Sequence, residues 1–283
     1  KKADGAIIKS SYPNVYEVTT INEECDTLEE FAILLKKHAA LGHCLLKGTP
    51  SRDLVCESRA GTTNTNAATD WVVLDVDGLD CRDVDEFMRL IQVTNVSYVV
   101  QYSASYKITG NDLRCHIYMW LDKPYAAPLI KQWLIQINHT IPQLRNAMTL
   151  TKTGNSVSWT LDITACQNDK LLYIAPPLLK GMKDPLKSGR IILVQGTTNH
   201  FTIPVTINTT AQNKVLTNKR ISELRDIAGY EPRKTTYKAH GSMEVMVKPD
   251  ACTISDIKTE RGYVYFNLNG GDSWGYYHPE DTP

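Results

Sequence analysis

The sequence has no net charge, no long hydrophobic run and no pair of cysteines at metal-ligand spacing. Basic and acidic residues each number 31 among 283, so no overall field draws the chain toward nucleic acid or lipid. Any nucleic-acid site must be a local patch. Hydrophobic runs stay far below the roughly 20 residues that cross a bilayer. We therefore expect a cytoplasmic protein with no membrane partner.

Cysteine chemistry is also not prominent. The seven cysteines are scattered, at positions 25, 44, 56, 81, 115, 166 and 252, without a CxxC pair. An odd number without framework spacing favours reduced thiols over disulfides and gives no sign of a zinc ribbon. The length allows one or two domains with a sizeable core. Because the sequence begins Lys1-Lys2 without methionine, we expect a fragment of a longer protein.

Two aspartates stand one residue apart in the otherwise apolar stretch DWVVLDVDGLD, residues 70–80. In a strand, Asp75 and Asp77 share one face, with Cα atoms about 6.5 Å apart. Burial and like charge both disfavour such an ionised pair, and a divalent cation would relieve that cost. Carboxylate oxygens suit magnesium or manganese. The alternative is an edge strand that runs into solvent, with Asp77-Gly78 opening a turn.

Two further stretches carry polar residues at strand spacing. The pattern LRCHIYMWL, residues 113–121, puts Arg114 and His116 on one face and apolar residues on the other. The pattern SVSWTLDIT, residues 156–164, puts Asp162 on a polar face, although Asp162 could also cap a turn or helix. If the three strands share one sheet, these side chains can gather on its open face: Asp75, Asp77, His116 and Asp162.

Helix and strand signals alternate along the first 200 residues. Thr27 and Glu30 form a capping box before a helix that Gly42 ends, and Pro128 opens a later helix. The order β-α-β-β-α-β from residue 71 to about 175 predicts an α+β fold, with an RNA-recognition-like antiparallel sheet after an N-terminal α/β unit. The predicted helices cover 84–91 and 130–137, and the further strands cover 43–48, 97–105, 171–177 and 190–196.

The last 80 residues have a different character. Residues 200–214 read as a polar connection, and residues 218–229 read as a short amphipathic helix ending at Gly229. Aromatic strands then flank Asn269-Gly270-Gly271-Asp272, which is a hairpin signal. We expect two units, 1–200 and 201–283. The tail has side chains that could pack on the first unit, dock a downstream part or bind template: Lys214, Lys219, Arg220, Arg225, Tyr263, Tyr265, Trp274, Tyr276 and Tyr277.

The series LDVDG, RCHIYMWLD and LDITACQNDKLLYIAPP resembles the three motifs of the archaeo-eukaryotic primase superfamily. The resemblance covers roughly residues 40–195 and is greatest to the primase-polymerase modules of phage and plasmid replication proteins. It implies a template-dependent nucleotidyltransferase, a DNA primase or DNA polymerase, in the cytoplasm of a bacterial host. Its partners would be a single-stranded DNA template, a primer and a fused or separate helicase.

The resemblance also implies roles for individual residues. Asp75, Asp77 and Asp162 would bind two Mg²⁺ or Mn²⁺ ions that activate a primer hydroxyl and neutralise the nucleoside triphosphate as pyrophosphate leaves. His116 would contact the nucleotide phosphates. The sequence departs from the family pattern where Arg114 replaces a small residue, and it lacks the zinc-binding insertion of some relatives. Plausible helpers in nucleotide binding are Arg114, Ser103, Ser105 and Lys170, with Arg59 a weaker candidate.

Three other classes of protein share parts of the pattern. A haloacid-dehalogenase-like phosphatase also begins with DxDG, but it would need Thr or Val where Leu79 stands, and a later acidic pair. A rolling-circle nicking enzyme would need a second histidine beside His116. An RNA-recognition-like binding module could stack bases on Tyr118 and Trp120 without catalysis. That last alternative leaves the three strand carboxylates unexplained.

Overall fold

The computed structural model describes residues 7–10, 15–204 and 206–230, together with the backbone of three later strands. The chain divides into two compact units, Lys1–Pro232 and Arg233–Pro283. The first unit is a mixed α+β structure with mainly antiparallel sheets, and its described part holds five α-helices. No helix in the described part of the chain is long and apolar enough to cross a membrane.

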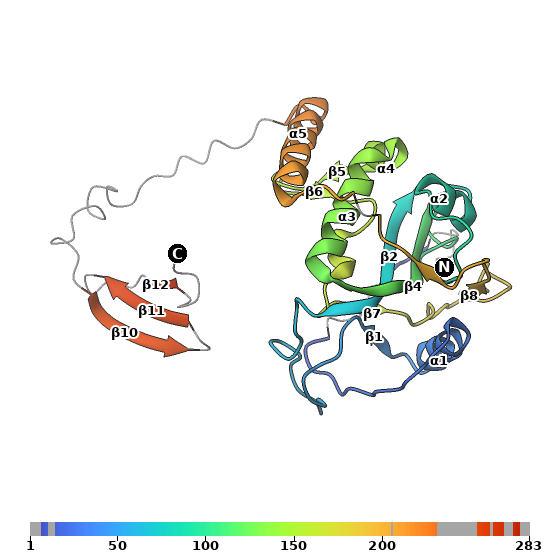
Figure 1. Ribbon diagram of the computed structural model, residues 1–283, viewed down its shortest axis with the longest axis horizontal. Helices are drawn as coiled ribbons and strands as arrows, with labels where there is room; N and C mark the ends of the chain where they lie inside the picture. The colour runs from blue at the N-terminus through green and yellow to red at the C-terminus, as the bar shows by residue number, and fades with distance from the viewer. Residues whose placement is uncertain are drawn as a thin grey trace. The chain divides into compact units, whose positions relative to one another are not determined.

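A central sheet organises the first unit, with strand order β2-β4-β3-β8 and antiparallel neighbours throughout that order. A short strand, β9, pairs parallel with β4. Figure 1 shows β2 and β4 side by side between the helices. Long apolar strands form here because their alternating side chains fill two hydrophobic cores. The strands are β2 (Ala68–Leu79), β3 (Tyr98–Tyr102), β4 (Leu113–Ala126), β8 (Ile191–Val194) and β9 (His200–Phe201).

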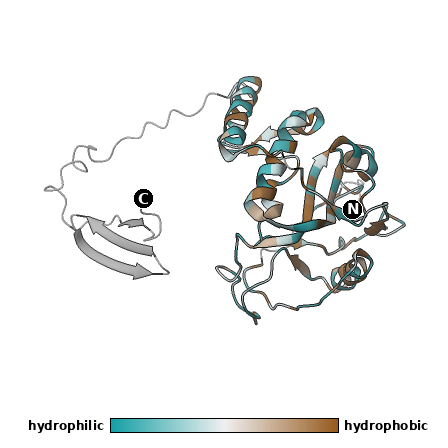
Figure 2. Ribbon diagram, viewed as in Figure 1, coloured by the Kyte–Doolittle hydropathy of each residue, from teal (hydrophilic) through white to brown (hydrophobic). Residues whose placement is uncertain are grey.

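One face of the sheet is covered by helices along its length. Leu74 of β2 and Ile117 of β4 are fully buried on this face, against Phe87 of α2 and Leu134 of α3. Asp83 caps the start of α2, and Pro128 stands in the first turn of α3, the latter as the sequence predicts. Hydrophobic residues concentrate in these strands and along α3 (Figure 2). The helices are α2 (Val84–Leu90), α3 (Ala127–Thr140) and α4 (Pro142–Ala147).

Helix α1 (Leu28–Ala40) covers only part of the opposite face. Its Thr27–Glu30 capping box is present, and Phe31 packs edge-on against Tyr118, with ring centroids 5.3 Å apart. The helix lies away from α3 and α4 in Figure 1. Beside it, β1 (Cys44–Leu46) pairs antiparallel with β7 (Leu171–Tyr173). The half of this face that holds the acidic residues is therefore left partly open.

The strand predicted over residues 156–164 is wrong in extent. Strand β6 covers only Val157–Ser158 and pairs with β5 (Thr149–Leu150). Asp162 instead caps the 3₁₀ helix η1 (Ile163–Cys166), because its carboxylate accepts a hydrogen bond from the Thr164 amide. Between them, Leu161 forms one antiparallel bridge with Val76 of β2. Alternation alone could not distinguish this single bridge from a continuous strand.

Helix α5 (Thr210–Ala228) begins eight residues before the predicted start at 218, so the connection expected over 200–214 is partly helical. Its apolar stripe is weak, and polar side chains attach it to α3 and α4. The Asn213 side chain donates to the Gln132 backbone at 3.0 Å. Arg220 is buried and donates to the Arg145 carbonyl. Helix α5 thus belongs to the first compact unit, which extends to Pro232.

The second unit has an antiparallel sheet of order β10-β11-β12. Its strands are β10 (Ile254–Glu260), β11 (Tyr263–Leu268) and β12 (Trp274–Tyr277). Strands β11 and β12 pair as the hairpin pattern predicts. The predicted turn at Asn269–Asp272 and the roles of the tail aromatic side chains lie outside the described residues.

We expect a fragment of residues 1–232 to unfold cooperatively near the melting temperature of the first unit in the full chain. A fragment of residues 1–208, which keeps β9 and the core residues Phe201 and Ile203 and lacks α5, should lose about 2–4 kcal/mol of unfolding free energy, since it gives up several part-buried hydrogen bonds to α5. One of these joins His139 to Thr217 at 3.0 Å. Thermal denaturation followed by circular dichroism measures the melting temperature and the stability of each fragment. Equal stability of the two fragments would contradict this account of α5.

Candidate active site

Four polar residues form a row across the partly open face of the central sheet. Asp75 of β2 lies opposite His116 of β4, and His116 lies opposite Gln101 of β3. On the other side of β2, the amide of Asp162 donates to the carbonyl of Asp75 at 2.8 Å. The order of the row is Asp162, Asp75, His116, Gln101. Facing residues on neighbouring antiparallel strands have Cβ atoms about 5 Å apart, so segments distant in sequence bring these groups together.

The second aspartate of the DxD pair forms an ion pair with Arg114. Asp77 lies opposite Arg114 in the β2–β4 register, and its carboxylate accepts a hydrogen bond from the Arg114 guanidinium. Gly78 makes room for it: a Cβ atom on Gly78 would lie 2.8 Å from an Arg114 nitrogen, and the Gly78 φ of +84° is left-handed. The Asp77 side chain is 67% exposed. An exposed pair of this kind contributes about 0–1 kcal/mol, so the carboxylate is free to change partner at little cost.

Asp162 is held by its own turn and by Lys170. Its carboxylate accepts hydrogen bonds from the amide and hydroxyl of Thr164 and from the Lys170 ammonium, the last at 2.9 Å. Burial acts to raise the pKa of Asp162, but the hydrogen bonds from Thr164 and Lys170 outweigh it and hold that pKa below its ordinary value. Asp162 therefore stays ionised at neutral pH.

Hydrogen bonds from two other segments of the chain hold the backbone around Lys170 in place. The amide of Lys47, just after β1, donates to the Lys170 carbonyl at 2.9 Å. The Arg59 guanidinium donates to the carbonyl of Asp169. The buried Asn168 side chain donates to the carbonyls of residues 64 and 67, both at 2.9 Å. Arg59 thus lies beside the site and binds the backbone next to Lys170, through the Asp169 carbonyl.

The two predicted serines lie beyond the end of β3. The Ser103 amide pairs with the Arg114 carbonyl at 2.9 Å, and the Ser103 and Ser105 hydroxyls are 3.2 Å apart. Buried Arg190 holds this turn by donating to the Ser103 carbonyl at 2.5 Å and by forming an ion pair with Asp184. Ser103 therefore neighbours Arg114, whereas no described contact joins either serine to the acidic residues.

The donor set fits a hard divalent cation, because three carboxylates lie on adjacent segments of one face. As they stand, these carboxylates do not surround a single point. In the described part of the chain, no three Asp, Glu, His or Cys side chains are placed to hold a metal ion. Asp77 is turned to Arg114, and Asp162 is turned to Thr164 and Lys170. Metal binding would require these two acids to exchange their cationic partners for the ion.

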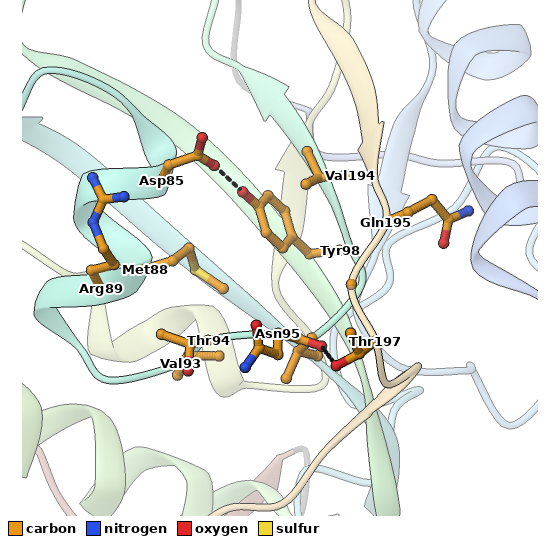
Figure 3. Close-up of a pocket in the computed structure, with 12 residues that line it drawn as sticks. Asp85, Met88, Arg89, Val93, Thr94, Asn95, Tyr98, Val194, Gln195 and Thr197 are labelled. Atoms are coloured by element: carbon orange, nitrogen blue, oxygen red, sulfur yellow. Dashed lines mark hydrogen bonds between the residues drawn. The ribbon is translucent and has the colours of Figure 1, made fainter.

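A cavity of about 510 Å³ lies at a different place, between α2, the start of β3 and the end of β8. Its wall includes Asp85, whose carboxylate accepts a hydrogen bond from the Tyr98 hydroxyl at 2.9 Å, as Figure 3 shows. None of the residues in the polar row lines this cavity. We assign the chemistry to the polar row, because Asp85 is the one acid among the residues that line the cavity, whereas the row and its neighbour Asp77 bring three carboxylates together on adjacent segments.

No protein-family model, curated protein or solved structure matches the chain. The assignment of the site therefore depends on its residues and their geometry. Sequence patterns had indicated the three acids, His116, Arg114 and Lys170, all of which lie on or beside the polar row. They missed Gln101 and Thr164. Gln101 could have been found because it is the one amide side chain in the apolar stretch YVVQY. It is two residues from Ser103 and so points to the same face of the strand.

Proposed function

We propose that the chain is a template-dependent nucleotidyltransferase, a DNA primase or DNA polymerase, that uses Mg²⁺ or Mn²⁺ and nucleoside triphosphates. The observation that carries the proposal is the polar row, in which Asp162 and Asp75 lie on adjacent segments beside His116. The primase-like order of the three motifs agrees with this row. The substrates would be a single-stranded DNA template and a primer, with a helicase as a fused or separate partner.

The strand arrangement supports the finer description of the sheet as RNA-recognition-like. Counting the segment around Leu161 as the last strand, the lateral order is that segment, β2, β4, β3. Helices α2 and α3 both pack on the same face. This order and packing support a split βαβ arrangement with two crossover helices. In that arrangement the acids lie on the opposite face of the sheet, which α1 covers only in part.

The proposed roles follow from charge. Asp75, Asp77 and Asp162 would hold the two ions, which supply charge stabilisation for phosphoryl transfer. The same three carboxylates would repel a triphosphate if the ions did not intervene. Arg114 and Lys170 would pair with phosphate oxygens once the ions replaced them as partners of Asp77 and Asp162. His116 lies between Asp75 and Gln101 and would contact the nucleotide phosphates.

A primer-extension and de novo priming assay tests the function directly. The full chain would be supplied with a primed or unprimed single-stranded template, ribo- or deoxyribonucleotides, and Mg²⁺, Mn²⁺ or a chelator. Incorporation that requires a divalent ion and follows the template is the expected result. Absence of incorporation under every combination, with a folded protein, would count against the proposal.

One observation favours a second candidate, a nucleic-acid-binding module without catalysis. Asp77 pairs with Arg114 and Asp162 pairs with Lys170, so these two carboxylates would repel a phosphate backbone less than unpaired ones. However, Tyr118 is fully buried against Phe31 and is not available to stack on a base. Single-strand binding that persists at full strength in a chelator, without incorporation, would favour this candidate over the polymerase.

We expect His116→Ala to weaken nucleotide binding by about 1.5–3 kcal/mol, the range for a hydrogen bond to a charged group. The fold should persist, because His116 lies at the partly open face and is not itself a member of either hydrophobic core. Titration with a nonhydrolysable triphosphate measures the loss. His200→Ala, at an exposed position on β9, is the matched control and should bind normally. Unchanged affinity of His116→Ala would remove His116 from the site.

A further inference from the structure

We propose that the lysine loop, residues 178–190 between β7 and β8, binds the phosphate backbone of a single-stranded nucleic acid that leads to the acids of the sheet. The choice of a nucleic acid as partner rests on the proposed function, whereas the charge and position of the loop do not. The loop has three lysines and one arginine against one aspartate, so its net charge is +3 in a chain whose net charge is zero. A chain without net charge needs such a local patch to attract a polyanion.

The single acid of the lysine loop is already paired inside the loop. Asp184 accepts hydrogen bonds from the Arg190 guanidinium at 2.7 and 3.0 Å. All three lysines are exposed, at positions 180, 183 and 187. Within the part of the chain that the structure describes, Lys183 and Lys187 have no ion pair or hydrogen bond. Their positive charges therefore remain available to an anion from outside the chain.

Buried Arg190 holds the lysine loop against the turn that follows β3. Arg190 is 7% exposed, and its guanidinium donates to the carbonyls of Ser103 at 2.5 Å and Tyr106 at 3.4 Å. Leu186 of the loop packs against the larger hydrophobic core. Because these contacts already order the loop, less conformational entropy is lost when its lysines bind a partner.

A second row of polar residues joins the acids to the lysine loop. Asp77 lies opposite Arg114, and the Ser103 amide donates to the Arg114 carbonyl at 2.9 Å, so Ser103 continues the row past the end of β3. On the other side of β3, the Tyr102 amide donates to the Arg190 carbonyl at 2.8 Å. Three steps of about 4.8 Å between neighbouring strands place the loop about 14 Å from Asp77. That span corresponds to about four stacked nucleotides at about 3.4 Å each.

The turn between the lysine loop and Arg114 also has hydroxyl groups. The Ser103 and Ser105 hydroxyls lie 3.2 Å apart in this turn and are partly exposed. Hydroxyl and basic side chains are the groups that contact phosphates in nucleic-acid complexes, and such contacts position a strand without reading its sequence. The loop, the turn and Arg114 therefore form a continuous run of phosphate-binding groups that ends at Asp77.

Anisotropy titration of a labelled oligothymidylate of roughly 20 nucleotides tests the surface, with the full chain in a chelator and salt from about 50 to 300 mM. Replacing Lys183 and Lys187 together by glutamine removes two phosphate contacts. The slope of log affinity against log salt should become shallower by about 1.4, and affinity should fall roughly 60-fold at about 50 mM salt. Replacing both by arginine keeps the charge and should preserve binding.

The matched control is Lys36→Gln with Lys152→Gln, which neutralises two exposed lysines elsewhere and should change affinity by less than about threefold, because salt screens distant charges. An equal loss in the two pairs would reflect net charge alone and would overturn the proposal. Wild-type affinity and slope in Lys183→Gln with Lys187→Gln would also overturn it. Circular dichroism checks that every variant is folded.

Two further measurements separate the partner from the nucleotide and from the reaction. Lys183→Gln with Lys187→Gln should bind a nonhydrolysable triphosphate normally, and a loss confined to the triphosphate would refute strand binding by the loop. A wild type that binds oligothymidylate through these lysines but incorporates no nucleotide in primer extension would refute the proposed function and leave the binding surface intact.

Discussion

Asp75→Ala and Asp77→Ala should each abolish template-directed incorporation, with a loss of about 10³-fold or more. Removing one metal ligand takes away charge stabilisation that phosphoryl transfer depends on, which is worth about 4 kcal/mol or more at such centres. Both side chains face the partly open side of the sheet and neither belongs to a hydrophobic core. The fold should therefore persist. Single-turnover primer extension measures the rate, and circular dichroism measures the fold.

The matched control is Asp80→Ala. Asp80 is an exposed aspartate just after β2, outside the polar row, and its loss should leave incorporation unchanged. Asp75→Asn adds a second comparison, because it keeps the shape and removes the charge. Substantial extension by either alanine variant would refute the two-metal assignment. Loss of ordered structure in Asp75→Ala or Asp77→Ala would show that the pair is structural.

Phe31→Ala should lower the free energy of unfolding by about 3–5 kcal/mol, the usual cost of removing a buried aromatic side chain. Phe31 is 8% exposed and contacts three aromatic residues of the sheet. Its ring lies 5.3 Å from Tyr118, 5.2 Å from Trp120 and 6.4 Å from Trp71. At about 2–4 °C per kcal/mol for a unit of this size, the melting temperature should fall by roughly 10 °C.

Ile33→Ala on the same helix is the control, because Ile33 is 65% exposed and should change stability by less than about 0.5 kcal/mol. Differential scanning calorimetry of the full chain measures both variants. A Phe31→Ala protein with the wild-type melting temperature would mean that α1 is not held on the sheet by this cluster. Loss of the Phe31 ring should also make Tyr118 accessible from the partly open face, because Phe31 packs on Tyr118.

Local patterns predicted most elements of the first unit. The Thr27–Glu30 box and Gly42 bounded α1 correctly, and the strands around Asp75 and His116 lie where alternation put them. Helix α5 was predicted only in part, since Thr209 and Gln212 form its capping box within a polar stretch. Its attachment through Asn213 and Arg220 depends on partners far away in the sequence, so periodicity carried no signal for it.

The sequence by itself determined that Asp75 and Asp77 share a face and that His116 and Arg114 share another strand face, because side chains alternate with period two. Only the tertiary structure decided which of these groups meet. Strand register placed Asp75 opposite His116 and Asp77 opposite Arg114, and backbone hydrogen bonding brought Asp162 beside Asp75 from a turn instead of a strand. Such pairings join residues that are 37 to 87 positions apart in the sequence through contacts of about 5 Å, and no local propensity specifies them.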